Sequence, residues 1–88
     1  MEIELTDDAK KDLYWHKKTG NKGINKKIEQ LFFALLENPY DGIGQPEELK
    51  HDLQGNWSRR INLEHRLIYT VDEDNQIIYI ISMWGHYK

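Results

Sequence analysis

Residues 57–83 read WSRRINLEHRLIYTVDEDNQIIYIISM, the clearest strand pattern of the chain. The pattern predicts strands at 57–62, 66–71 and 76–83. In the middle strand Leu67, Tyr69 and Val71 share one face, because successive side chains of a strand point to opposite sides. The last strand is apolar on both faces, which is typical of a strand in the interior of a sheet.

Two helices precede this half. Apolar side chains recur at the helical period from Ile24 to Leu35, and Asn38-Pro39 ends that helix. An earlier helix runs from an N-cap at Thr6 to about Lys18. Short strands are predicted at 2–5 and 49–53. The order β-α-α-β-β-β-β indicates one α+β domain over 1–88, with both helices packed on one face of a mainly antiparallel, twisted sheet.

Composition limits the chemistry. The chain has 88 residues and no cysteine, which excludes a disulfide framework and a thiolate zinc site. His16, His51 and His65 lack the paired spacing of metal ligands, so we expect no metal and no other cofactor. The longest apolar stretch, residues 77–81, is too short to cross a membrane, and the opening MEIEL is unlike a signal peptide. We therefore expect a cytoplasmic protein without a membrane partner.

The positive charges are clustered although the net charge is −3. Lys50, Arg60 and Arg66 occupy even positions, opposite the core-facing odd positions, and would form an anion site on the uncovered face of the sheet. The alternative is an ion-paired outer face with Asp52 and Glu64 as partners. Seven lysines between residues 10 and 27 are either an RNA-binding surface or solvated side chains.

A base and an acid flank these cations. Glu47 and Glu48 come just before Lys50, and His86 follows the last strand. Cleavage of a phosphodiester needs a base, an acid and positive charge near the transition state. An imidazole can exchange protons near neutral pH, but an exposed terminal histidine can also have no role. The three tryptophans, although able to stack on bases, are expected in the core of so small a domain.

Four motifs point to one family: PEELKH at 46–51, GNWSRRI at 55–61, EHRLIY at 64–69 and HY at 86–87. In this order and at these separations they resemble the YoeB/Txe toxins. These are RelE-like mRNA interferases of bacterial type II toxin–antitoxin systems. The resemblance covers nearly the whole chain.

The resemblance implies a ribosome-dependent endoribonuclease that cuts mRNA in the ribosomal A site. The RNA 2′-hydroxyl would attack its own 3′-phosphate. The implied catalytic residues are Glu47 (general base), Arg66 (phosphate stabilisation) and His86 (general acid), with Lys50, Arg60 and Tyr87 binding substrate. The implied partners are a YefM/Axe-like antitoxin, the ribosome and a second copy in a homodimer. DNA would be contacted only through the antitoxin.

Two positions depart from the family pattern. Lys88 extends the chain beyond the terminal tyrosine. Gly85 stands where a larger side chain is common, so we expect a looser backbone beside His86. The rival hypothesis is a non-catalytic inhibitor or binding module on the same fold. The joint presence of Glu47, Arg66 and His86 favours the enzyme.

Overall fold

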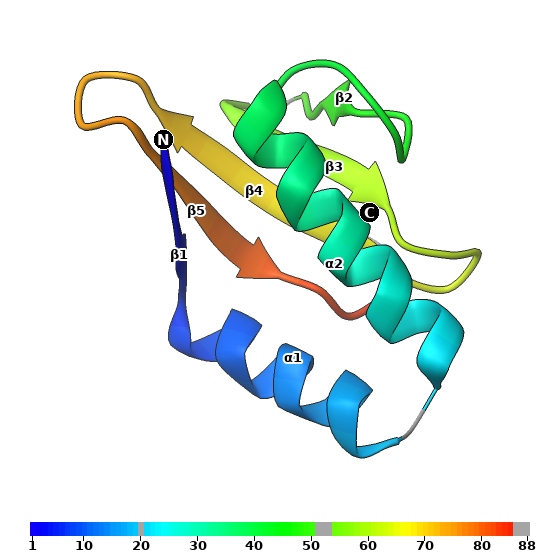
Figure 1. Cartoon of the computed structure of the whole chain (residues 1–88). Helices are drawn as coiled ribbons and strands as arrows, with labels where there is room; N and C mark the ends of the chain where they lie inside the picture. Colours follow the sequence, from blue (N-terminus) through cyan, green and yellow to red (C-terminus); the bar gives the residue numbers. More distant parts are fainter. Residues whose placement is uncertain (20, 51–53, 86–88) are drawn as a thin grey trace.

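The computed structural model describes residues 1–19, 21–50 and 54–85. Its elements in chain order are β1 (Glu2–Leu5), α1 (Asp7–Lys18), α2 (Lys22–Glu37), β2 (Glu47–Glu48), β3 (Asn56–Arg60), β4 (Arg66–Asp72) and β5 (Ile77–Ser82). Figure 1 shows α2 lying across the sheet and α1 beside it, next to the end of β1. The α+β class and the predicted order of elements are confirmed.

Among the described residues the strands form one mixed sheet in the order β1-β5-β4-β3-β2. β1 pairs with β5 in parallel, and the other three pairings are antiparallel. The register between β4 and β5 shifts at Ile68 and Tyr69, a bulge that increases the local twist. β4 therefore lies at the centre of the sheet, with a neighbouring strand on each side.

Side-chain caps fix where the two helices begin. The Thr6 hydroxyl accepts a hydrogen bond from Ala9 N (3.1 Å) and donates one to the Ile81 carbonyl (2.9 Å). The same side chain thus starts α1 and ties it to β5. The Asn21 side chain accepts from Ile24 N (3.0 Å) and starts α2. α2 ends at Glu37, directly before Asn38-Pro39, as predicted. No helix in the described ranges is both long and apolar enough to cross a membrane.

The core lies between α2, α1 and one face of the sheet. The sheet contributes buried apolar side chains at 67, 69, 78 and 80, Ile61 follows directly after β3, and the helices contribute Ala9, Ile28, Leu31 and Leu35. The predicted inward positions Ile61, Leu67 and Tyr69 are confirmed.

Two expectations were wrong. The predicted strand at 49–53 is replaced by β2, two residues earlier, because Glu47 and Glu48 pair with β3 and Lys50 follows outside that pairing. Residues 51–53 lie outside the described residues. Trp15 and Trp84 are not core residues. They are 52% and 50% exposed, and their ring centroids lie 6.5 Å apart on the surface.

Candidate active site

The sheet face turned away from the helices carries three of the predicted site residues. Glu47 pairs with Ser58, and Arg60 pairs with Arg66. Cross-strand partners share a face, and so do residues two apart on one strand. We call this the open face, defined by Glu47, Ser58, Arg60, Arg66 and Ile68. The register of β2, β3 and β4 thus brings a carboxylate and two guanidinium groups to the same side of the sheet.

The other predicted site residues, Lys50, His86 and Tyr87, are not among those that define the open face. Lys50 is exposed and follows β2, where it lines a shallow depression at the sheet edge with Glu48 and Gln54. His86 and Tyr87 lie outside the described residues. Their neighbour Gly85 is described, and its carbonyl accepts a hydrogen bond from Arg66 N (3.0 Å). The chain therefore meets the first residue of β4 one position before His86.

Gly85 is held and not loose, so the expectation of a freer backbone at this glycine was wrong. Its N–H donates to His65 Nδ1 (2.9 Å), and its carbonyl is bonded as described above. Its φ of +72° lies in the left-handed region, where a side chain is strained. The glycine therefore permits a turn that is fixed by hydrogen bonds.

The alternative interpretation of this face was a set of ion pairs with Asp52 and Glu64. Of these two carboxylates, only Glu64 is among the described residues. The Glu64 carboxylate lies 3.9 Å from His65 Nε2. For Arg60, no carboxylate of the described residues lies within 4.0 Å. Arg60 is therefore available to bind an anion at this edge of the open face.

Ser58 is a residue of the open face that the sequence did not single out. Its side chain is fully buried, and its hydroxyl has no hydrogen-bond partner among the described residues. Such a hydroxyl typically costs about 1–3 kcal/mol. It sits opposite Glu47 and two positions before Arg60, buried beneath the candidate site.

Arg59, next to Arg60, has the opposite environment and was also missed. It is fully buried on the helix-covered face. Its guanidinium donates to the carbonyls of Asn38 (2.7 Å), Asp41 (2.9 Å) and Ile43 (3.1 Å). These carbonyls belong to the loop between α2 and β2. The odd-position rule places Arg59 inward, and that signal could have found it.

Tyr69 completes this anchor. Its hydroxyl donates to the Pro39 carbonyl (2.6 Å) and accepts from Arg59 Nε (3.3 Å). Burial raises the pKa of the Tyr69 phenol, while the hydrogen bond and the charge of Arg59 act in the opposite direction. The phenol therefore stays protonated and keeps donating to the loop that leads into Glu47.

The far end of the same loop packs closely against α2. The Gly44 carbonyl accepts from Arg60 N (2.6 Å). Gly44 has a φ of +86°, and a Cβ there would meet Leu31 Cδ2 at 2.8 Å. The loop is thus pinned at both ends, which fixes the start of β2 and the position of Glu47 relative to β3.

Comparison with known proteins identifies the family. Residues 5–87 match the model of the YoeB-like toxin of bacterial type II toxin–antitoxin systems. The chain belongs to this family. The toxin YoeB of Synechocystis sp. is 43% identical over 88 residues, covering 100% of this chain and 99% of that relative.

Solved structures agree over the whole fold. A YoeB/ParE toxin from Agrobacterium tumefaciens has a TM-score of 0.92 at 33% identity and covers 99% of this chain and 100% of its own. YoeB from Staphylococcus aureus, solved as a dimer, has a TM-score of 0.86 at 41% identity, covering 99% and 98%. A YoeB–YefM complex from Staphylococcus aureus has a TM-score of 0.85 at 42% identity, again covering 99% and 98%.

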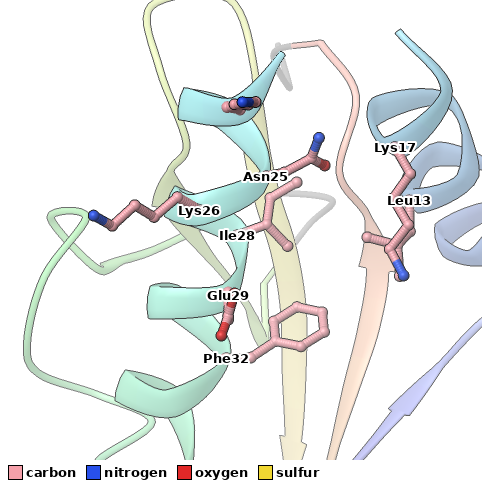
Figure 2. A pocket seen from close by; sticks show the side chains of 8 residues that line it. Leu13, Lys17, Asn25, Lys26, Ile28, Glu29 and Phe32 are labelled. Carbon is pink, nitrogen blue, oxygen red and sulfur yellow. The ribbon is translucent and has the colours of Figure 1, made fainter. Parts of the chain in front are cut away.

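The lysine run is spread over three surfaces: two involve α1, and the third, beside Arg60, is lined by Lys27 of α2. Figure 2 shows one of them, a groove lined by α1 and α2: Ile28 and Phe32 of α2 face α1, and Lys17 lies beside Leu13 on α1. The lining residues are Leu13, Lys17, Lys22, Asn25, Lys26, Ile28, Glu29 and Phe32. The other surface of α1 carries Lys10, Lys11 and Lys18, and Lys18 Nζ lies 5.7 Å from the ring centroid of Trp15.

Proposed function

We propose that this chain is a ribosome-dependent endoribonuclease that cleaves mRNA in the cytoplasm and thereby inhibits translation. The supporting observation is the register of three adjacent strands, which gathers Glu47, Arg60 and Arg66 on the open face. A pure binding module would need the cations but would have no use for a base beside them.

The proposed reaction is an intramolecular attack. Glu47 takes the proton of the RNA 2′-hydroxyl, and the oxygen forms a bond to its own 3′-phosphorus. The bond from phosphorus to the 5′-oxygen breaks, and His86 protonates that leaving oxygen. The products are a 2′,3′-cyclic phosphate and a 5′-hydroxyl. Because the nucleophile is part of the substrate, no entropy is spent on capturing water.

The cations have distinct proposed roles. Arg66 lies on the central strand and stabilises the developing charge on the scissile phosphate, since a guanidinium grips two phosphate oxygens at once. Arg60, its cross-strand partner, and Lys50, at the sheet edge, neutralise the flanking backbone. Tyr87 positions the substrate beside His86.

Adjacent glutamates provide a matched test. Glu47 pairs with Ser58 on the open face, whereas Glu48 pairs with Trp57 and lies on the other face. On programmed ribosomes, Glu47→Gln should slow cleavage about 100-fold or more, and Glu48→Gln should leave the rate near wild type. A fast Glu47→Gln enzyme would remove this residue from the mechanism. Cleavage next to a single 2′-deoxy nucleotide on the 5′ side of the scissile bond would refute 2′-hydroxyl attack.

The non-catalytic rival makes a different prediction. A binding module would inhibit translation with the message intact, and Glu47→Gln would stay inhibitory. We expect that variant to be both non-cleaving and harmless to translation.

We also propose an acidic antitoxin segment of the YefM/Axe kind as the occupant of the groove in Figure 2. S. aureus YoeB has been solved with YefM, and the groove is lined by apolar side chains and by lysines. Reversing Lys17 and Lys26 to Glu should weaken antitoxin binding on the order of 10-fold. The control reverses Lys10 and Lys11 on the other surface of α1, and equal effects would refute the site.

Two further partner proposals concern a second copy of the chain and DNA. S. aureus YoeB has been solved as a dimer, so we propose a homodimer here, which sedimentation equilibrium would test. We further propose that the toxin contacts operator DNA only through its antitoxin. A mobility shift by the toxin alone would contradict this.

A further inference from the structure

After β5 the chain leaves the regular sheet pairing, and Met83 and Gly85 are held by hydrogen bonds to side chains and to one backbone N–H. Met83 N donates to Asp12 Oδ2 (2.9 Å), and the Met83 carbonyl accepts from His16 Nε2 (2.7 Å). Both donor and acceptor belong to α1. The helix therefore fixes the chain at the point where β5 has ended.

Two residues further on, the chain is bonded to His65 and Arg66. Gly85 N donates to His65 Nδ1 at 2.9 Å, and Arg66 N donates to the Gly85 carbonyl at 3.0 Å. Both polar groups of the Gly85 backbone are thus bonded to two consecutive residues at the start of β4. Two of the four bonds in this segment depend on an imidazole: the Met83 carbonyl needs a hydrogen on His16 Nε2, and Gly85 N needs a His65 Nδ1 without one.

His65 is itself tightly held. It is only 7% exposed. Its ring centroid lies 4.4 Å from that of Trp84 and 4.9 Å from that of His16, which meets it edge-on. Its backbone N–H donates to Asn62 Oδ1 (2.7 Å). Packing on two sides and a fixed backbone leave the imidazole little rotational freedom, so Nδ1 is directed at Gly85.

We propose that His65 is a positioning residue for the catalytic acid. The ring is neutral, carries its hydrogen on Nε2, and uses Nδ1 to fix Gly85 and so the point at which the chain continues to His86. This inference rests on the proposed function, in which His86 protonates the leaving group. His65 touches no substrate, because its ring is buried under Trp84 and against His16.

Two substitutions of His65 test separately the hydrogen-bond acceptor at Nδ1 and the packing of the ring. His65→Asn places an amide oxygen near the position of Nδ1 but lacks the ring. His65→Phe keeps the ring contacts with Trp84 and His16 but offers no acceptor. If the acceptor positions the acid, His65→Phe lowers kcat on programmed ribosomes about 10- to 100-fold with KM unchanged, since a misplaced acid slows chemistry and leaves binding intact. His65→Asn should retain most of the wild-type kcat.

Amide hydrogen exchange and ring ¹⁵N shifts test the contact without any cleavage assay. In the wild-type protein we expect a protected Gly85 amide and the Nε2–H tautomer of His65. In His65→Phe the Gly85 amide should exchange at least 10-fold faster, and in His65→Asn it should stay protected. An Nδ1–H or doubly protonated ring would overturn the proposal, as would equal behaviour of the two variants. A wild-type protein that shows these signatures but cuts no RNA would refute the proposed function and leave the contact standing.

Discussion

The buried arginine gives the sharpest prediction about stability. Arg59→Met keeps a long apolar stem in the core and removes the guanidinium. Four hydrogen bonds are lost, to the carbonyls of Asn38, Asp41 and Ile43 and to the Tyr69 hydroxyl. The carbonyls then remain partly buried without their donor.

The magnitude follows from these contacts. Hydrogen bonds to a charged group contribute about 1.5–3 kcal/mol each but are not additive, and removing the buried charge recovers part of its desolvation cost. We expect a net loss of about 3 kcal/mol in the free energy of unfolding. For a domain of 88 residues this corresponds to a fall in Tm of about 12–24 °C.

Arg60→Met is the matched control, because it makes the same change one residue later on the exposed side of the same strand. Urea unfolding followed by circular dichroism should place it within about 0.5 kcal/mol of wild type. We expect it to cleave RNA poorly with a normal fold. An Arg59→Met protein within 1 kcal/mol of wild type, at an unchanged m value, would refute the anchoring role.

Three further outcomes are expected. In thermal melts, Gly44→Ala should destabilise the fold by about 2–4 kcal/mol, because the added Cβ has no room. Gly55→Ala should cost only about 1 kcal/mol, from its positive φ, since its surroundings are open. Equal losses in the two variants would contradict this. The pKa of Tyr40 is raised from 10.0 to about 12 by the hydrogen bond to Glu73, then by burial and by the charge of that carboxylate. This contact therefore stabilises the fold below pH 10, and the stabilisation is lost as the pH rises toward 12. Absorbance titration at 295 nm should show the pKa falling toward 10 in Glu73→Gln, and an unmoved titration would exclude the contact. Ser58→Ala should unfold at the same urea concentration as wild type or slightly higher, because its hydroxyl has no partner among the described residues, and a loss above 1 kcal/mol would reveal one.

Sequence periodicity predicted the parts of the fold that depend on local rules. Thr6 and Asn38-Pro39 set helix ends through backbone chemistry, and alternation placed Leu67 and Tyr69 inward. β2 was misplaced because a strand of two residues has no periodicity of its own, and its position depends on pairing with β3.

The candidate site depends more on long-range contacts. Arg59 was given no role from the sequence, because the carbonyls that satisfy it lie 16–21 positions away in the sequence. The resemblance supplied the role of Glu47, but only the register with Ser58 gives its face of the sheet. His65 was weighed as a metal ligand, and its bond to Gly85 spans 20 positions that no spacing rule connects.

The two segments that lead into the proposed site are anchored by side chains in addition to backbone hydrogen bonds. Arg66 belongs to the central strand, which has a hydrogen-bonded neighbour on each side. The loop leading to Glu47 depends on Arg59, and the segment leading to His86 depends on His65 and on His16. Substitutions in these anchors therefore move the base or the acid relative to a fixed Arg66. Because a displacement of about 1 Å can cost two orders of magnitude in rate, activity should fail in such variants before the sheet unfolds.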